Sequence, residues 1–207
     1  MYNSRLGGVG SDHIDEHFGV QARITTLASF RAEFSFGIAD TQVIAKRLTE
    51  RAFIHLQRSI VADESIRSGW KQAYDEGETA CEKLGAVHLL QHGIWAFKAT
   101  GQGERTDLVM GEPISNFDEV QGVAEALVLT EWKLVRQASE LADKLADARS
   151  QASRYGRGLL GGFELAGYRY LVIVSERILQ LPPDEIVDNI RYRHVNIAVD
   201  PLPPSRN

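Results

Sequence analysis

Apolar residues recur with a helical period in the first third of the chain. From residue 40 onward they occupy every fourth position: Ile44, Leu48, Ala52, Leu56 and Ile60. This spacing places their side chains on one face of an α-helix. Residues 20–38 contain a short alternation of apolar and polar positions, which indicates a weak strand. Residues 1–19 are glycine-rich and polar, so we expect a flexible N-terminus, followed by a mainly helical extension over residues 20–64.

The next part of the chain predicts one helix and three strands. The helix is expected from Ser65 to about His92, because Gly93 can supply the left-handed residue that ends a helix. Three strand-like runs follow, at Ile94–Thr100, Arg105–Met110 and Ala124–Val135. The glycine-containing loop between the first two runs predicts a hairpin. The third run begins with continuous apolar residues, which is typical of a strand buried on both faces.

A further helix and two further strands complete the expected fold. The helix covers about 136–155 and ends in a glycine cluster, and the strands lie at Tyr168–Ser175 and Tyr192–Val199. The order from residue 65 is therefore α-β-β-β-α-β, which predicts one α/β domain over residues 65–200. The proline-rich residues 201–207 are expected to form a flexible tail.

Composition places few restrictions on function. The 207 residues are 43% hydrophobic and 25% charged, as in an ordinary soluble domain. The net charge of −5 does not favour a nucleic-acid binder, although a local basic face matters more than the sum. The single Cys81 excludes an intramolecular disulfide and fits a reducing compartment. With no signal-peptide pattern and no apolar run near the roughly 20 residues of a membrane span, we expect a cytoplasmic protein without membrane contact.

Two polar side chains stand at the end of the most apolar strand. Because side chains alternate on a strand, Glu131 and Lys133 share one face and Trp132 takes the other. An E-x-K triplet is common, and taken alone it is better explained by a solvated ion pair at a strand end. Asp107 also lies in a mostly apolar strand, where a carboxylate is costly unless it is paired or binds a metal. If the two strands pair, Asp107 and Glu131 converge on an oxygen-rich pocket that suits Mg²⁺ or Mn²⁺.

Asp107, followed by Glu131-x-Lys133 on the next predicted strand, resembles the signature of the PD-(D/E)XK nuclease superfamily. The residue before the aspartate is Thr106, where the signature has proline. The resemblance implies a restriction-endonuclease-like α-β-β-β-α-β core, with a mixed central sheet flanked by helices. It covers about residues 65–175.

Two further elements of the chain fit the same resemblance. A glutamate on the helix before the first core strand belongs to the pattern, and Glu82 is the preferred candidate, with Glu78 one turn away as its rival. Gln151 and Tyr155 resemble the Q-x-x-x-Y element of the RecB-type branch, and at i,i+4 they project from one helix face. Taken alone, the pair is equally explained by a surface glutamine beside a core tyrosine.

The resemblance implies a metal-dependent nuclease that hydrolyses phosphodiester bonds, with DNA as the expected substrate. Asp107, Glu131 and the backbone carbonyl of Trp132 would hold Mg²⁺ or Mn²⁺, and Glu82 would complete a second metal position. Lys133 would orient or help deprotonate the attacking water, or stabilise charge on the phosphate.

Supporting roles in this mechanism fall on residues of the following helix. Gln151 and Tyr155 would position the nucleic-acid strand or support the metal ligands. Arg154 and Arg157 flank the tyrosine and are the candidates for phosphate contacts.

Two other readings of the sequence stay open. The protein is a non-catalytic nucleic-acid-binding or assembly protein that keeps the nuclease fold, or its helices at 40–62 and 65–92 form a homodimer or bind a protein partner. His88 and His92 stand at i,i+4 and suggest a metal clamp, but histidines near a helix C-terminus also interact favourably with the helix dipole, and that interpretation is preferred.

Overall fold

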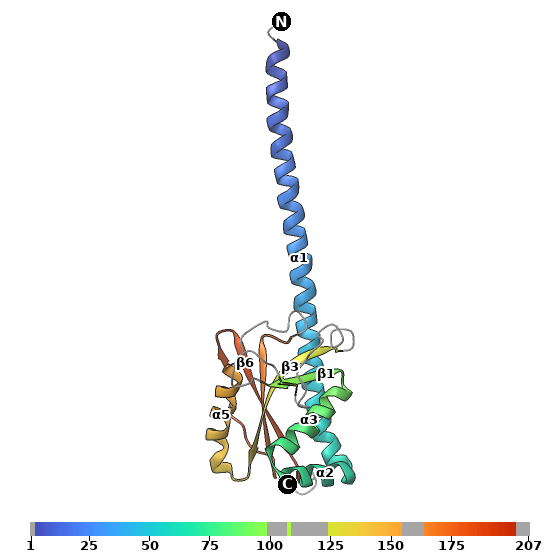
Figure 1. The fold of residues 1–207 in the computed structure, drawn as a ribbon, viewed down its shortest axis with the longest axis vertical. Helices are drawn as coiled ribbons and strands as arrows, with labels where there is room; N and C mark the ends of the chain where they lie inside the picture. Colours follow the sequence, from blue (N-terminus) through green and yellow to red (C-terminus); the bar gives the residue numbers. More distant parts are fainter. Residues whose placement is uncertain (1–2, 99–106, 109–123, 155–163, 202–207) are drawn as a thin grey trace. The chain divides into compact units, whose positions relative to one another are not determined.

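The computed structural model describes the backbone of residues 3–98, 107–108, 124–154 and 164–201, and the side chains of all these except 3–18, 38–40 and 107–108 (Figure 1). The chain divides into two units, Met1–Thr41 and Gln42–Asn207. In chain order the elements are α1 (Asn3–Ala62), α2 (Glu64–Glu76), α3 (Glu78–Gln91), β1 (Ile94–Lys98), β2 (Asp107–Leu108), β3 (Ala126–Val135), the 3-10 helix η1 (Ala138–Glu140), α5 (Leu141–Ser153), β4 (Tyr168–Ser175), β5 (Glu185–Val187) and β6 (Ile190–Ala198).

The first unit is helical throughout its described residues. Helix α1 begins at Asn3, inside the segment that the sequence predicts to be flexible, and it continues through residues 20–38. The weak strand expected there is therefore wrong. The physical reason is the spacing of its larger apolar residues, which is closer to a helical period than to strict alternation. These side chains are exposed within the unit: Val20, Ile24, Leu27, Phe30, Phe34 and Phe36.

The second unit is built on a mixed six-stranded sheet with the order β2-β1-β3-β4-β6-β5. Strands β1, β3, β4 and β6 run parallel to one another, whereas the edge strands β2 and β5 run antiparallel to β1 and β6. Every residue of β3 is buried, as its continuous apolar run predicts for a central strand covered on both faces. The prediction of an α/β fold with a mixed sheet flanked by helices is confirmed.

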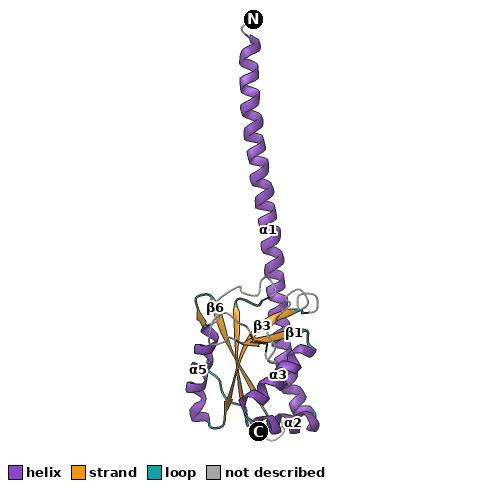
Figure 2. Ribbon diagram, viewed as in Figure 1, coloured by secondary structure: helices purple, strands orange, loops and turns teal. Residues whose placement is uncertain are grey.

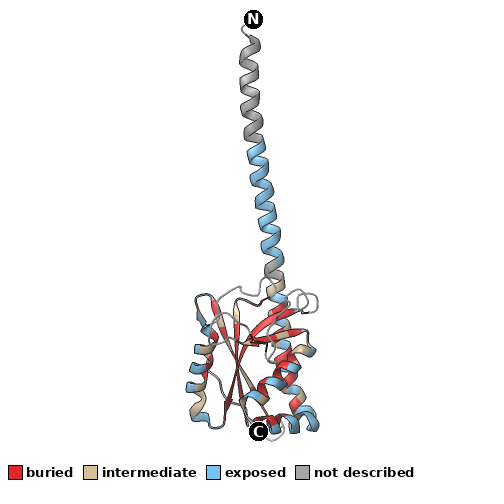
Figure 3. Cartoon of the chain, viewed as in Figure 1, coloured by how far each residue is buried: buried red, intermediate tan, exposed pale blue. Residues whose placement is uncertain are grey.

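Helices cover both faces of this sheet (Figure 2). Residues of α1, α2 and α3 pack on one face, where Leu56, Trp70 and Leu89 belong to the same core cluster as Val128 of β3. Helix α5 packs on the other face through a second cluster that contains Ala148. The strands between these layers form the buried interior (Figure 3). The apolar stripe predicted for residues 44–60 therefore packs largely against the sheet of its own chain, with Ala52, Leu56 and Ile60 buried.

Two glutamine side chains join α1 to the backbone of the sheet region. Gln42 donates to the carbonyl of Glu164 at 2.6 Å and accepts from the amide of Ala166 at 3.1 Å. Gln57 donates to the carbonyl of Ala198 at 3.1 Å and accepts from the amide of the same residue at 2.7 Å. A carboxamide offers one acceptor and a donor group, as a peptide does, so each glutamine satisfies backbone groups that a neighbouring strand would otherwise pair.

The single helix predicted for residues 65–92 is two helices in the structure. Asp63 caps α2 by accepting hydrogen bonds from the amides of Ser65 and Ile66. Gly77 then has φ +126°, a conformation that side-chain-bearing residues rarely adopt, and it separates α2 from α3. The expected end of the helix is confirmed, because Gly93 has φ +72°.

Candidate active site around Lys133

The second half of β3 has one pairing partner among the described strands. Strand β1 pairs with β3 only as far as Phe97 and Leu129. From Thr130 to Val135, β3 pairs with β4. Among the described residues, the start of α3 contacts this stretch of β3 through Glu78, which pairs with Lys133.

Lys133 is buried, and its ammonium group contacts three side-chain acceptors. Only 5% of the residue is exposed. Its Nζ lies 3.0 Å from Oδ2 of Asp147, 3.1 Å from Oε1 of Gln151 and 3.2 Å from Oε1 of Glu78. An ammonium group has three N–H donors, so these acceptors match its hydrogen-bonding capacity. The lysine is held between α5 and the first residue of α3.

The neighbouring carboxylates keep Lys133 charged. Burial alone lowers the pKa of Lys133, but its hydrogen bond to Asp147 and the charge of Glu78 oppose this, and the pKa is raised overall. The pKa of Asp147 is lowered, chiefly by its hydrogen bond to Lys133. Lys133 is therefore a cation at neutral pH. Of the roles that the sequence suggests, stabilising negative charge suits it better than accepting a proton from water.

Gln151 fixes the arrangement on α5. Its Nε2 donates to both carboxylate oxygens of Asp147, at 3.1 and 3.2 Å, while its Oε1 accepts from Lys133. The two α5 side chains stand at i,i+4, which places them on the same helix face. The glutamine thus holds the carboxylate that pairs with the lysine.

Glu131 lies two residues before Lys133 on the same strand and is 4% exposed. By alternation it shares the face of β3 that carries Leu129 and Val135, which is the face covered by α5. A carboxylate this deeply buried requires pairing or a cation. Glu131 and Lys133 therefore lie on one buried face of β3, as strand alternation predicts.

The two candidate glutamates of α3 contact different lysines. Glu82, the preferred candidate from the sequence, is 7% exposed and lies 3.1 Å from Nζ of Lys98. Glu78, its rival, contacts Lys133. The structure therefore brings the rival, and not the preferred residue, into contact with the lysine of the E-x-K triplet.

Asp107 lies further from Glu131 along the sheet than the sequence suggests. It occupies β2, where it pairs with Lys98 of β1. Strands β1 and β2 pair antiparallel, as the hairpin prediction requires. The condition for a shared pocket, pairing of the Asp107 strand with the Glu131 strand, is not met among the described residues, because β1 lies between them. The physical reason is that the hairpin gives β2 to one edge of β1, and β3 occupies the other edge in parallel. Two strand spacings, about 10 Å, thus separate β2 from β3.

The side chain of Trp132 belongs to the core on the face opposite Lys133. Its ring lies 6.3 Å from the rings of both Phe53 and Trp70, and its Nε1 donates to Oγ1 of Thr130 at 3.2 Å. Only its backbone carbonyl is a candidate ligand. Of the remaining predicted site residues, Arg154 is exposed at the end of α5, and Tyr155 and Arg157 lie outside the described residues.

Among the described residues around Lys133, the side-chain atoms that could bind a metal ion are oxygens. The carboxylates of Glu78, Glu82, Glu131 and Asp147 are hard ligands of the kind that Mg²⁺ and Mn²⁺ prefer. They are not gathered into one ligand set, since lysines pair with three of them. In the part of the chain that the structure describes, one group of three ligating side chains has donor atoms within 4.8 Å of one another, and it consists of His55, His88 and His92. The sequence singles out the second and third of these histidines and misses the first, which comes from α1.

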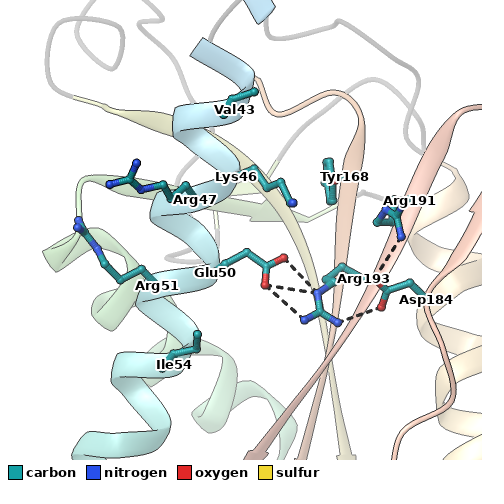
Figure 4. Close-up of a pocket in the computed structure, with 10 residues that line it drawn as sticks. All are labelled: Val43, Lys46, Arg47, Glu50, Arg51, Ile54, Tyr168, Asp184, Arg191 and Arg193. Carbon is teal, nitrogen blue, oxygen red and sulfur yellow. Dashed lines mark hydrogen bonds and ion pairs between the residues drawn. The ribbon is translucent and has the colours of Figure 1, made fainter. Parts of the chain in front are cut away.

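A basic pocket of about 790 Å³ lies on the α1 face of the sheet, on the side opposite α5 (Figure 4). Its charged lining residues are Lys46, Arg47, Glu50, Arg51, Asp184, Arg191 and Arg193. Arg193 is held between Glu50 and Asp184, each at 3.1 Å, and Figure 4 shows Arg47 and Arg51 extending from the other side of α1. The pocket therefore carries five cationic and two acidic side chains in a chain whose net charge is −5.

No family model, curated protein or solved structure matches this chain. Within the described residues, no helix combines the length and the apolar character that crossing a membrane requires. The site around Lys133 must therefore be interpreted from its own chemistry.

Proposed function

We propose that the protein is a metal-dependent nuclease of the PD-(D/E)XK type that hydrolyses phosphodiester bonds of nucleic acid, with DNA as the expected substrate. The observation that carries the proposal is the contact of Lys133 with both Gln151 and Glu78, beside the buried Glu131. These residues come from β3, α5 and α3. The resemblance in the sequence predicts that these three elements contribute to one site, and their contact at Lys133 supports that prediction.

The residues fit a Mg²⁺ or Mn²⁺ ion by donor chemistry. Glu131 and the carbonyl of Trp132 would hold it, and Glu82 or Glu78 would serve a second position. Asp107 would reach the same ion only across the two strand spacings that separate β2 from β3. When bound, such an ion lowers the pKa of a coordinated water and polarises the phosphoryl oxygens. Among the described residues, the chain would contribute carboxylate and carbonyl oxygens as ligands.

Lys133 supplies fixed positive charge for the phosphate. Its three acceptors are not equivalent, since the Asp147 side chain is 52% exposed whereas that of Glu78 is 38% exposed. A phosphate oxygen that replaced Asp147 would keep the three donors of the ammonium group occupied. Gln151 would then hold the displaced carboxylate close by, because its own hydrogen bonds to Asp147 do not involve Lys133. Charge of this kind, fixed before substrate arrives, stabilises the additional negative charge of the transition state.

The test is cleavage of plasmid, linear duplex DNA, single-stranded DNA and RNA by the purified chain, in Mg²⁺ and separately in Mn²⁺. Lys133→Met should lower the cleavage rate by about a hundredfold or more, the scale of one electrostatic group in an active site. The same loss is expected for Glu131→Gln. The matched control is Lys71→Met, because Lys71 is also ion-paired, to Asp200 at 3.1 Å, and lies on α2.

The proposal fails if the chain cleaves none of these substrates with either ion, or if Lys133→Met cleaves as fast as the unchanged protein. Thermal unfolding of each variant accompanies the assay, so that a loss of rate is assigned to the site only where the fold is intact.

A second candidate function is non-catalytic binding of nucleic acid. The basic pocket favours it, because five cations in a chain of net negative charge form a local site for phosphate. Phosphate contacts make affinity fall steeply with salt. Binding that weakens on Arg47→Ala and Arg51→Ala, without cleavage in either ion, would favour this function. A protein partner or second copy through the N-terminal helix stays a prediction.

A further inference from the structure

Three histidines from two helices gather at the end of α3. His55 comes from α1, His88 from the last turn of α3, and His92 is the residue that ends this helix. The ring centroids are 5.4 Å apart for His55 and His88, 5.1 Å for His55 and His92, and 5.0 Å for His88 and His92. One nitrogen of each ring lies within 4.8 Å of the corresponding nitrogens of the other two.

Two of these nitrogens are already near the spacing of metal ligands. Nδ1 of His55 lies 3.0 Å from Nε2 of His92. Two imidazole nitrogens bound tetrahedrally to one zinc ion are about 3.3 Å apart, given Zn–N bonds of roughly 2.0 to 2.1 Å. A hydrogen bond between two neutral rings accounts for this one distance. The third ring adds a further nitrogen within 4.8 Å of both, so that one cation could contact all three.

The third histidine is oriented by the backbone. Nε2 of His88 lies 3.1 Å from the carbonyl oxygen of Ala52, one turn before His55 on α1. A carbonyl oxygen only accepts, so Nε2 carries the hydrogen, and in the neutral ring Nδ1 keeps its lone pair. Metal-binding histidines characteristically donate their second ring nitrogen to a carbonyl or carboxylate in this way.

The pKa values of His88 and His92 are both lowered by their surroundings. Burial lowers the pKa of His88, and His92 and His55 lower it further, against the hydrogen bond to Ala52. Burial is also the largest cause that lowers the pKa of His92, followed by His55 and Arg51. The lowered pKa of His88 and of His92 favours the neutral form, which is the form that binds a metal ion.

We propose that His55, His88 and His92 form a binding site for one divalent transition-metal ion of the zinc class. Three imidazoles suit Zn²⁺, Cu²⁺ or Ni²⁺ and not Mg²⁺, which prefers oxygen. Three protein ligands leave a fourth position for water or another group. The ion would connect α1 to the end of α3. Along α3, His88 and His92 lie about 15 and 21 Å from Glu78, at roughly 1.5 Å per residue, so the site is separate from the Lys133 contacts.

The test is calorimetric titration of the full chain, made without a histidine tag and freed of metal by a chelator, with ZnCl₂ and separately with MgCl₂. We expect one Zn²⁺ per chain and no Mg²⁺ binding at this site. Zinc at about a hundred times its dissociation constant should raise the melting temperature by roughly 5 to 10 °C.

His55→Gln is the decisive variant, because His55 is exposed and its replacement should leave the fold intact. Loss of this ligand should weaken zinc binding by at least about a hundredfold, since even supporting residues of metal sites contribute ten- to a hundredfold. His92→Gln should behave alike. His17→Gln is the matched control on the same helix, and it should bind zinc like the unchanged chain.

The proposal is overturned if the chain binds no zinc, or if His55→Gln and His92→Gln bind it with unchanged affinity and stoichiometry. Nuclease activity in Mg²⁺ should not change in His55→Gln, so failure of the zinc site and failure of the proposed nuclease are separately visible.

Discussion

The indole ring of Trp132 lies directly against the backbone of Gly85. A Cβ atom added to this glycine would lie 2.1 Å from Cη2 of the ring and 2.2 Å from Cζ2. Contacts this short do not occur, so α3 can approach β3 this closely only because residue 85 has no side chain. The same approach brings the start of α3 to Lys133.

Gly85→Ala should therefore destabilise the protein. Overpacking a core typically costs about 1 to 3 kcal/mol, and the expected change is of this size in urea unfolding. The control is Gly69→Ala on α2, where an added Cβ meets nothing within 4 Å and the better helix propensity of alanine should stabilise slightly. If the cause is the indole ring, Gly85→Ala should cost less in a Trp132→Leu background than in the unchanged chain.

The pH dependence of stability should report the Lys133–Asp147 pair. The pKa of Lys133 is raised above its ordinary 10.5, so its contribution is fully present below that pH and is lost as pH rises through the raised value. The pKa of Asp147 is lowered below 3.8, so its contribution is present above that pH and is lost as pH falls through the lowered value.

Lys133→Met removes both effects. Melting temperatures of this variant and the unchanged protein should differ by a constant amount between about pH 5 and 9. Above about pH 10.5 and below about pH 3.8, the unchanged protein should lose stability relative to the variant. Parallel curves at both extremes would contradict the pairing.

Tyr170 and Tyr74 give a matched pair of buried hydroxyls. The Tyr170 hydroxyl has no hydrogen-bond partner within the described part of the chain, whereas that of Tyr74 donates to the carbonyl of Val135 at 2.9 Å. An unsatisfied buried polar group costs about 1 to 3 kcal/mol. Tyr170→Phe should therefore raise the free energy of unfolding by about 1 kcal/mol, and Tyr74→Phe should lower it by a similar amount. Equal losses in both variants would show that the Tyr170 hydroxyl has a partner.

The two glutamates of α3 should differ in their effect on cleavage. Glu78→Gln removes a charge that contacts Lys133, whereas Glu82→Gln removes one that contacts Lys98. We expect the first change to lower the rate of DNA cleavage more than the second, by at least about tenfold for one electrostatic contact in a catalytic site. The reverse order would restore Glu82, the residue that the sequence prefers, to the metal-binding role.

Local sequence patterns predict the helices and strands of this fold better than they predict which strands lie side by side. The apolar run that opens β3 and the hairpin between β1 and β2 are readable because each is encoded within a few residues. Gly77 is easily missed, since the helical spacing of apolar residues continues across it. The position of β1 between β2 and β3 depends on which edges meet in space, and no short segment encodes that choice.

The residues of the candidate site also divide into those that local patterns assign and those that only packing brings together. Glu131, Lys133 and Gln151 are visible in the sequence because strand alternation and helical spacing assign them to faces. Asp147 and the contact of Glu78 with Lys133 depend on where α5 and α3 cross β3. The same holds for His55, whose helix is far in sequence from His88, so that only the packed structure brings the rings together.

The double hydrogen bond between Gln57 and Ala198 has a consequence for biosynthesis. In the native fold the carboxamide of a helix made early pairs with the backbone of a strand made late, so the core stays incomplete until the ribosome has delivered β6. Until then, the sheet-facing residues of α1 and the outer edge of β4 are exposed, and such surfaces make nascent chains prone to aggregate. The demand for a chaperone should therefore be greatest just before β6 emerges from the ribosome.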